Sequence, residues 1–215
     1  MVLIIGHRGA RNLWPENSLE GFKRTRDLGV DAVEFDVHLA RDGELVVIHD
    51  PSLERTTQGT GPVADRTAGE LAAMGVPSLE AVLDVYAGTP IELHVEIKTD
   101  ALGRAYEGLE KLLLDVIGRR KLEQQAVVTS FVPEILETVR RLSPPQRVLA
   151  SLDRRSAELF GGLPAALDRF AVIGRSEEHT SELQSHLCIS SGSSEERRVG
   201  KECTSVCRSR WSPYH

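Results

Sequence analysis

The stretch VEFDVHLARDGELVVIHD, residues 33–50, decides the fold of this chain. Its first half alternates apolar with ionisable residues, as a strand does when one face packs on a core and the other lines a site. A turn at RDG follows, and a second apolar run leads to His49 and Asp50. The apolar set is Val33, Phe35 and Val37, and the ionisable set is Glu34, Asp36 and His38.

The same pattern returns in IELHVEIK, residues 91–98. Leu93, Val95 and Ile97 share one face, and His94, Glu96 and Lys98 share the opposite one. Two strands that carry carboxylates on equivalent faces predict one shared site.

Short apolar runs alternate with amphipathic helical stretches up to about residue 174, which is typical of an α/β protein with mostly parallel strands. A closed barrel of this class needs eight strands, and the sequence offers seven. The predicted strands are residues 3–7, 32–38, 45–49, 91–97, 126–131, 147–152 and 171–174. The predicted helices are residues 17–29, with Asn17 as N-cap and Gly29 as the stop, 79–87, 103–118, 133–142 and 155–168.

Two stretches depart from a regular barrel. The link from Asp36 to His49 is too short for a crossover helix, so an irregular arrangement is expected there. Residues 51–78 form a long insertion rich in Thr and Gly, with a small capped helix from Thr67. Loops of this length are more often functional than idle.

Composition narrows the class of protein. The chain has 215 residues, 40% hydrophobic and 27% charged, with a net charge of −6, which disfavours nonspecific binding to nucleic acid or anionic membranes. No apolar run reaches the ~18 residues of a membrane span. The N-terminus, MVLIIGHRG, lacks a basic leader region, so we expect a cytoplasmic protein without stable membrane insertion. The sequence carries no signal of oligomeric state.

The C-terminal segment, residues 175–215, has a different character from the rest. It has almost no apolar periodicity, so we expect it to be disordered. RSEEHTSELQS (175–185), SEERRVGKEC (194–203) and CRSRWSPYH (207–215) resemble translated short-read sequencing adapters. All three cysteines lie in this segment and therefore carry no functional inference. We expect the parent gene to continue differently after residue 174.

Residues able to do chemistry follow several predicted strands, where parallel β/α barrels place their catalytic groups. Glu34, Asp36 and Glu96 would supply hard oxygen ligands for Mg²⁺ or Ca²⁺. Arg8 and Lys98 suit a phosphate, and His7 and His49 suit proton transfer. A single residue of this kind at the end of a strand is more often structural than catalytic. Several of them at the ends of successive strands together indicate a site.

Six segments of the first 174 residues together resemble the glycerophosphodiester phosphodiesterase family, in that family's order. They are HRGARNLWPENS, VEFDVHLARDGELVVIHD, LERTTQGTG, VPSLEAVL, LHVEIK and SF at 130–131. The resemblance implies a (β/α)₈ TIM-like barrel with an insertion after the third strand. It also implies metal-dependent hydrolysis of a small glycerophosphodiester to glycerol 3-phosphate and an alcohol.

Matched position by position, the resemblance assigns roles to these residues. Glu34, Asp36 and Glu96 would bind the divalent cation, His7 and His49 would be the catalytic acid and base, and Arg8 and Lys98 would bind the substrate phosphate. Glu16 and Asn17 would support the site and cap a helix, and His38 and His94 would lie in the barrel interior.

The resemblance covers residues 3–174, so the barrel would be incomplete as written, with its last strand or strands missing. Exposed strand edges would then remain, and we expect the 215-residue chain to be unstable or prone to aggregation. A cooperative thermal melt with native-like near-UV dichroism would argue against this.

Two other functions stay open on the sequence. One is a phosphodiesterase of the lysophospholipase D or sphingomyelinase type, which uses similar histidines and carboxylates. The other is an inactive fragment or phosphate-binding module. Comparing a water-soluble diester with a lipid substrate separates the first from the main hypothesis.

Overall fold

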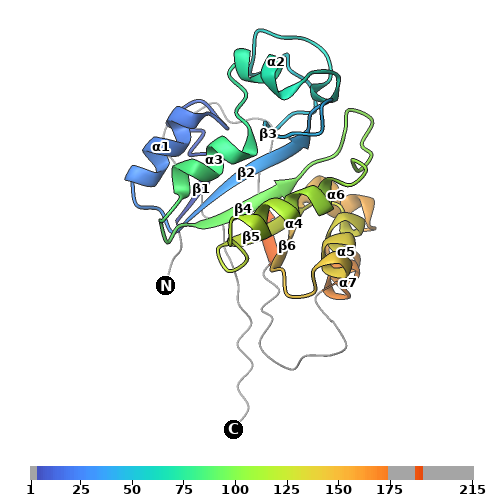
Figure 1. The fold of residues 1–215 in the computed structure, drawn as a ribbon. Coiled ribbons are helices and arrows are strands. Elements are labelled where there is room, and N and C mark those ends of the chain that lie inside the picture. Colours follow the sequence, from blue (N-terminus) through green and yellow to red (C-terminus); the bar gives the residue numbers. More distant parts are fainter. Residues whose placement is uncertain (1–3, 174–186, 191–215) are drawn as a thin grey trace.

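The computed structural model describes residues 4–173 and 187–190. Seven strands form one sheet with the order β1-β2-β4-β5-β6-β7, and β3 pairs only with β2. Figure 1 shows the strands rising side by side through the molecule, with helices packed along them. The strands are β1 Ile5–His7, β2 Ala32–Leu39, β3 Leu45–Val47, β4 Glu92–Ile97, β5 Ala126–Ser130, β6 Val148–Asp153 and β7 Leu187–Ser190.

All pairings along this order are parallel, as the alternating pattern predicts. The pairing of β2 with β3 is antiparallel, which confirms that no crossover helix joins them. This hairpin turns the chain back on itself, and the Ile48 N–H donates to the Asp36 carbonyl at 3.1 Å. This hydrogen bond brings His49, the next residue after Ile48, close to Asp36 of β2.

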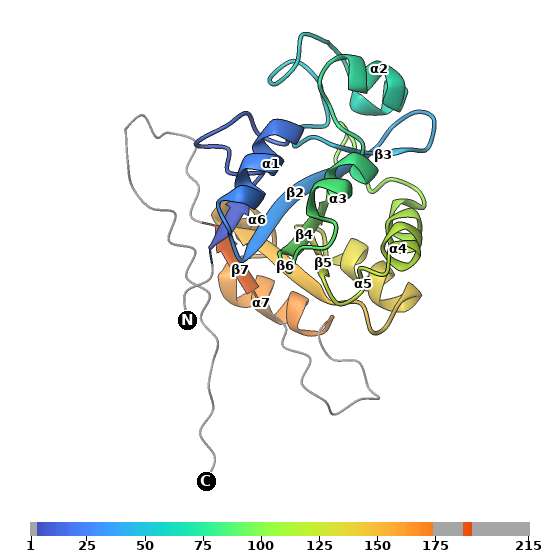
Figure 2. The same cartoon turned by 60° about the vertical axis from the view of Figure 1, so that its left-hand side comes forward.

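Helices cover the outer face of the curled sheet, as Figure 2 shows for α3, α4, α5 and α7. This is the layered arrangement of a parallel β/α barrel. The helices are α1 Leu19–Asp27, α2 Ala68–Ala73, α3 Leu79–Tyr86, α4 Leu109–Arg119, α5 Pro133–Leu142, α6 Arg154–Leu159 and α7 Leu163–Ala171, with a 3₁₀ turn, η1, at Val63–Asp65.

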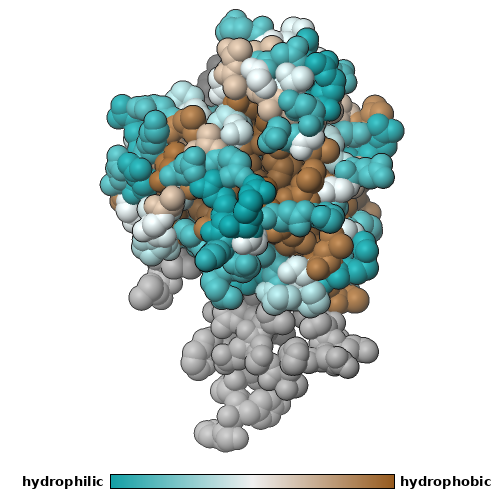
Figure 3. Space-filling model, viewed as in Figure 1, coloured by the Kyte–Doolittle hydropathy of each residue, from teal (hydrophilic) through white to brown (hydrophobic). Residues whose placement is uncertain are grey.

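The main core lies between these helices and the sheet. Phe22 of α1 is fully buried, with its ring edge-on to Phe35 of β2 at 5.8 Å and to Tyr86 of α3 at 6.2 Å between centroids. The Tyr86 hydroxyl donates to the Phe22 carbonyl at 3.1 Å, so the buried phenol is satisfied. Brown surface lies over the middle of the view in Figure 3, with teal over most of the rim. Buried apolar residues of α1, α3, α4 and α5 pack with those of the strands in this core.

The N-cap of α1 is Ser18, and the prediction of Asn17 was wrong by one residue. The Ser18 hydroxyl accepts from the Gly21 N–H at 3.0 Å. Asn17 has a φ of +52°, outside the extended conformation that an N-cap needs. Its side chain instead donates to the Asp36 carboxylate at 2.9 Å. Tertiary contact with β2 overrides the local capping preference.

Replacing Ser18 by Ala is expected to lower the free energy of unfolding by about 1 kcal/mol, because the Gly21 N–H loses its acceptor. Urea denaturation followed by far-UV dichroism measures this. Ser143→Ala serves as a control, because Ser143 follows α5 and makes no side-chain cap. An Ser18→Ala variant as stable as the wild type would contradict the assignment.

The C-terminal part differs from the prediction in two places. Residues 155–168 form two helices, α6 and α7, because Gly161 and Gly162 between them have φ values of +88° and +110°. The strand predicted at 171–174 is wrong, because α7 extends to Ala171. Its residues Ala166 and Phe170, followed by Ile173, are buried at helical spacing against Leu136 of α5.

The helix predicted at 103–118 begins only at Leu109. Before it, a loop is closed by a bridge between Thr99 and Ala105, and Gly108 takes a φ of +77°. The insertion carries its own small core around Leu53, Val63 and Leu71, and α2 is capped by Thr67 as predicted.

Within 175–215, where we expected no regular element, the four residues of β7 pair in parallel with β6. The backbone groups on the free side of β6 can accept such a strand whatever its side chains. The other residues of 175–215 lie outside the part of the chain that the structure describes. Gly174, where the sequence predicts that the barrel domain ends, also lies outside it. Across the described residues, no helix is both long and apolar enough to cross a membrane.

Candidate active site

The structure brings the predicted site residues to one end of the sheet. His7 is the last residue of β1, Glu34 and Asp36 lie on β2, and Glu96 lies near the end of β4. The sheet register pairs His7 with Glu34 and Asp36 with Glu96. Because paired residues of parallel strands share a face, these side chains meet on the concave side of the sheet.

Glu34, Asp36 and Glu96 form a compact acidic triad. Each offers a carboxylate oxygen, and these oxygens lie within 4.8 Å of one another. Asp36 is 1% exposed and Glu96 is 8% exposed. Burial and the charges of Asp36 and Glu96 raise the pKa of Glu34 well above its ordinary value. Burial also raises the pKa of Glu96, and Lys98 only partly opposes this.

Several buried polar atoms around the triad have no protein partner. They include Oε1 of Glu34, Oδ1 of Asn17 and Oγ1 of Thr129, which is paired in register with Glu96. Unpaired buried oxygens are costly unless something else binds them. An all-oxygen donor set with excess negative charge fits a hard divalent cation such as Mg²⁺ or Ca²⁺. The residues present therefore fit the ion that the sequence predicts.

Two cationic side chains border the triad. Lys98 Nζ lies 2.7 Å from Glu96 Oε1 and 3.4 Å from Asp36 Oδ1. Although burial lowers it, these two carboxylates raise the pKa of Lys98. Arg8 Nε lies 3.5 Å from Asp36 Oδ2, and the Arg8 backbone N–H donates to Glu34 at 3.0 Å. Arg8 has a φ of +51°, a strained conformation that this contact helps to hold.

The two predicted catalytic histidines come from different segments: His7 ends β1, and His49 follows β3. His7 Nε2 is 3.6 Å from Glu34 Oε2, and burial, aided by the charge of Arg8, lowers the pKa of His7 to about 4. His49 Nδ1 is 2.6 Å from Asp50 Oδ1, which leaves Nε2 as its free ring nitrogen. Burial, followed by the charge of Lys98, lowers the pKa of His49.

His38 and His94 lie on the same strands and the same faces as triad residues: His38 follows Asp36 by two positions, and His94 is paired in register with Glu34. His38 is fully buried, with Nδ1 2.8 Å from the Tyr106 hydroxyl and Nε2 3.2 Å from the His49 carbonyl. His94 Nε2 is 2.7 Å from Glu92 at the amino end of β4. Both histidines hydrogen bond within the protein, His38 to the segment that bears His49, and His94 to the first residue of β4.

Arg55 lies in the site, although the sequence analysis gave it no role. It comes from the insertion and ion-pairs with both Glu16 and Asp50. Its position in LERTTQGTG, a segment that begins three residues after Asp50, was the only signal for it. The sequence also offered no sign of Thr129 and Tyr106. The pattern of a strand or loop does not show which residues of other strands will lie beside it.

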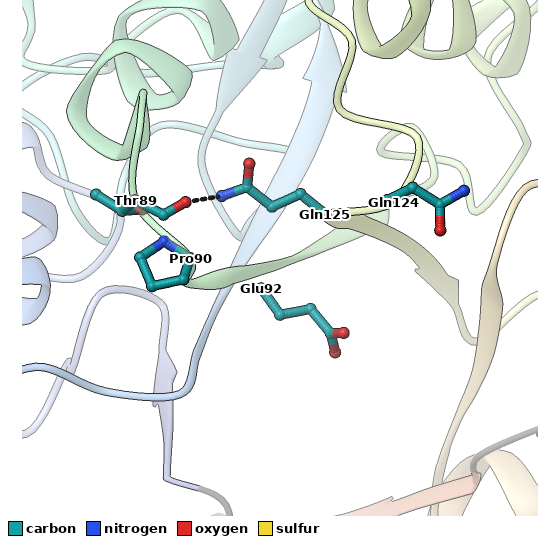
Figure 4. A pocket seen from close by; sticks show the side chains of 5 residues that line it. All are labelled: Thr89, Pro90, Glu92, Gln124 and Gln125. Atoms are coloured by element: carbon teal, nitrogen blue, oxygen red, sulfur yellow. Dashed lines mark hydrogen bonds between the residues drawn. The ribbon is translucent and has the colours of Figure 1, made fainter.

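A surface hollow of about 260 Å³ lies at the opposite end of the sheet. It is lined by Thr89, Pro90, Glu92, Gln124 and Gln125, and Figure 4 shows the Gln125 amide donating to the Thr89 carbonyl while Glu92 points away from that pair. These residues lie before β4 and β5 begin or at their first positions. The hollow is therefore separate from the acidic triad.

Comparison with known proteins places these residues in a family context. The sequence profile described as "Glycerophosphoryl diester phosphodiesterase family" matches residues 7–181. A glycerophosphodiester phosphodiesterase of Caldanaerobacter subterraneus subsp. tengcongensis is 33% identical over 159 residues, which are 68% of this chain and 65% of that protein. The chain thus spans about two thirds of the length of such relatives.

Solved structures share the fold. A glycerophosphodiester phosphodiesterase from Thermotoga maritima superposes with a TM-score of 0.67 at 22% identity, covering 88% of this chain and 74% of that one. An Oleispira antarctica phosphodiesterase, solved in complex with the product sn-glycerol-3-phosphate, gives a TM-score of 0.63 at 24% identity, covering 80% and 72%. These likenesses establish the barrel-type architecture of the described sheet.

Proposed function

The chain belongs to the glycerophosphoryl diester phosphodiesterase family, and from this premise we propose that it hydrolyses a glycerophosphodiester to glycerol 3-phosphate and an alcohol. The observation that carries the proposal is the grouping of three carboxylates within 4.8 Å of one another beside two cationic side chains and His7. The product complex of the Oleispira antarctica relative supports the substrate class.

Glu34, Asp36 and Glu96 would hold a divalent cation, Mg²⁺ or Ca²⁺. When bound, such a cation supplies Lewis-acid stabilisation of the charge that develops on phosphoryl oxygens. Asp36 and Glu96 are buried, and the Asn17 amide holds Asp36 in place by donating to its carboxylate at 2.9 Å. Although burial opposes it, Lys98, His49 and Arg8 lower the pKa of Asp36, so this carboxylate stays charged.

Arg8 and Lys98 would bind the phosphate of the substrate. Arg8 offers a planar fork and Lys98 a point charge, and both are held in place by carboxylates of the site. As the bond to the leaving alcohol breaks, negative charge grows on the phosphoryl oxygens. Positive groups fixed beforehand stabilise that state more than the ground state.

His7 and His49 would move the protons. One takes a proton from the attacking oxygen, of water or of the glycerol hydroxyl, and the other gives a proton to the leaving alkoxide; if the glycerol hydroxyl attacks first, water then opens the cyclic phosphate. The Asp50 carboxylate accepts from His49 Nδ1 at 2.6 Å, which fixes the ring and presents Nε2 for the transfer.

The test is release of glycerol 3-phosphate from glycerophosphocholine and glycerophosphoethanolamine by the purified chain. We expect release that stops with a chelator and returns when Mg²⁺ or Ca²⁺ is added in excess. A lysophospholipid and sphingomyelin are run in parallel. Faster turnover of these lipids would favour the lysophospholipase D or sphingomyelinase type, and no turnover of any diester with either ion would overturn the proposal.

A further inference from the structure

We propose that Arg55 is a positioning residue that joins the two sides of the site and sets the orientation of both Arg8 and His49. This rests on the proposed function, since it concerns the same phosphodiester chemistry. Arg55 lies in the insertion, and the groups it joins come from the loop after β1 and the segment after β3. We call the set Glu16, Asp50 and Arg55 the clasp.

The guanidinium of Arg55 contacts both oxygens of both carboxylates. It donates to Asp50 from Nε at 2.5 Å and from NH2 at 3.1 Å. It donates to Glu16 from NH1 at 2.9 Å and from NH2 at 2.6 Å. Only a planar fork with several N–H groups can satisfy two carboxylates in this way. A lysine ammonium has three N–H donors on one atom, so it could not make all four of these contacts.

Each carboxylate of the clasp also hydrogen bonds to a residue of the site and so limits the positions that its side chain can take. Glu16 Oε1 also accepts from Arg8 NH1 at 3.3 Å. Asp50 Oδ1 also accepts from His49 Nδ1 at 2.6 Å. Arg8, Glu16, Arg55, Asp50 and His49 thus form one continuous chain of hydrogen bonds. A shift of Arg55 would change the phosphate-binding side and the proton-transfer side together.

The charges of Glu16 and Asp50 explain why a positively charged side chain is needed between them. Glu16 and Asp50 side chains are 14% and 25% exposed, and the two share no other positive partner as close as Arg55 within the described residues. Although burial raises it, the hydrogen bonds of Arg55 and His49 lower the pKa of Asp50 to about 2. Both carboxylates therefore stay charged and able to accept at the same time.

The insertion holds Arg55 firmly. Leu53 is fully buried in the insertion core, and its N–H donates to the Gly61 carbonyl at 3.1 Å. Thr57 donates twice to the Leu53 carbonyl, from its N–H at 3.1 Å and from its hydroxyl at 2.8 Å. Arg55 sits in the turn between these two residues. The insertion thereby has a role in the reaction although it supplies no carboxylate of the triad.

The experiment compares Arg55→Gln and Arg55→Lys with the wild type. The Arg55 side chain is 46% exposed, so neither change leaves a cavity. Arg41→Gln is the matched control, because Arg41 also ion-pairs with a carboxylate, Glu70, at 3.2 Å on the edge of the insertion but touches no site residue. The measurements are kcat and KM for glycerophosphocholine, the thermal midpoint, and ¹⁵N NMR of the His49 ring.

We expect Arg55→Gln to lower kcat/KM about 10- to 100-fold, with Arg55→Lys intermediate and Arg41→Gln within about twofold of the wild type. The NMR spectrum should show His49 mainly protonated at Nδ1 in the wild type and a mixture of tautomers in Arg55→Gln. A double-mutant cycle of Arg55→Gln with Asp50→Asn should be strongly non-additive, since both changes break one chain of bonds.

Equal kcat/KM in Arg55→Gln and Arg41→Gln would overturn the proposal, and so would an unchanged His49 tautomer. The NMR arm needs no turnover and therefore separates two kinds of failure. If the wild type hydrolyses no diester but the His49 tautomer depends on Arg55, the proposed function fails and the clasp geometry stands. If the wild type is active but the His49 tautomer is the same with and without Arg55, the proposed role of Arg55 is wrong and the proposed function stands.

Discussion

Replacing Glu34 by Gln is expected to remove nearly all phosphodiesterase activity while leaving the metal-free protein as stable as before. Burial, followed by the charges of Asp36 and Glu96, raises the pKa of Glu34, so without a cation the neutral amide of Gln is a close substitute. With a cation, one of the three anionic ligands becomes a neutral and weaker amide oxygen. We expect a fall in kcat/KM of about 10³-fold, equivalent to about 4 kcal/mol of transition-state stabilisation.

The same variant gives a readout that needs no substrate. A cation at a hundred times its Kd should stabilise the wild type by about 2.7 kcal/mol, which raises Tm by roughly 5–10 °C in a chain of this size. Differential scanning calorimetry with Mg²⁺ or Ca²⁺ against EDTA measures this, and Glu34→Gln should show little of the shift.

Glu92→Gln is the matched control for this variant. Glu92 is a strand carboxylate of β4 at the opposite end of the sheet, where it bonds His94 and Arg147. We expect its activity and its metal-dependent Tm shift to match the wild type. A Glu34→Gln variant that keeps the full Tm shift would show that the triad is not the metal site.

Replacing His49 by Asn is expected to lower kcat by 10²- to 10⁴-fold. Asn keeps a donor where Nδ1 meets Asp50 but lacks the Nε2 atom that faces away from that carboxylate. The fold should be unaffected, because the His49 side chain is 29% exposed and packs in no core cluster. Steady-state kinetics with glycerophosphocholine measures the loss.

Two checks separate proton transfer from other effects of His49→Asn. The metal-dependent Tm shift should equal that of the wild type, since His49 lies outside the triad. His94→Gln is the histidine control, because Gln can still donate to Glu92 at the far end of β4. Activity of His49→Asn within about threefold of the wild type would remove His49 from the catalytic pair.

The alternating patterns of β2 and β4 were enough to predict where the acidic triad forms. A period of two fixes the face on which Glu34, Asp36 and Glu96 lie, and parallel strands end at the same edge of a sheet. The short link at RDG likewise predicted the β2–β3 hairpin. These inferences succeed because each pattern lies within one short segment, and the general rule for parallel strands brings the two segments to the same edge.

Predictions near the ends of elements were weaker. Asn17 has the residue type of an N-cap, yet Asp36, nineteen positions further along, recruits its side chain and leaves Ser18 to cap α1. A strand was predicted at 171–174, but α7 extends to Ala171, and Phe170 and Ile173 are buried against Leu136 of α5. In both cases a long-range contact outweighs the local preference.

The sequence by itself determined the α/β class, the face that carries the ionisable residues, and the family that the chain resembles. Only the tertiary structure decided that Lys98 lies between Glu96 and Asp36, that Thr129 lies beside Glu96, and that Arg55 joins Glu16 to Asp50. The physical reason is distance along the chain. Periodicity fixes the direction of a side chain relative to its own strand, whereas the identity of its partner depends on the register between strands and on the path of the loops, which no local pattern encodes.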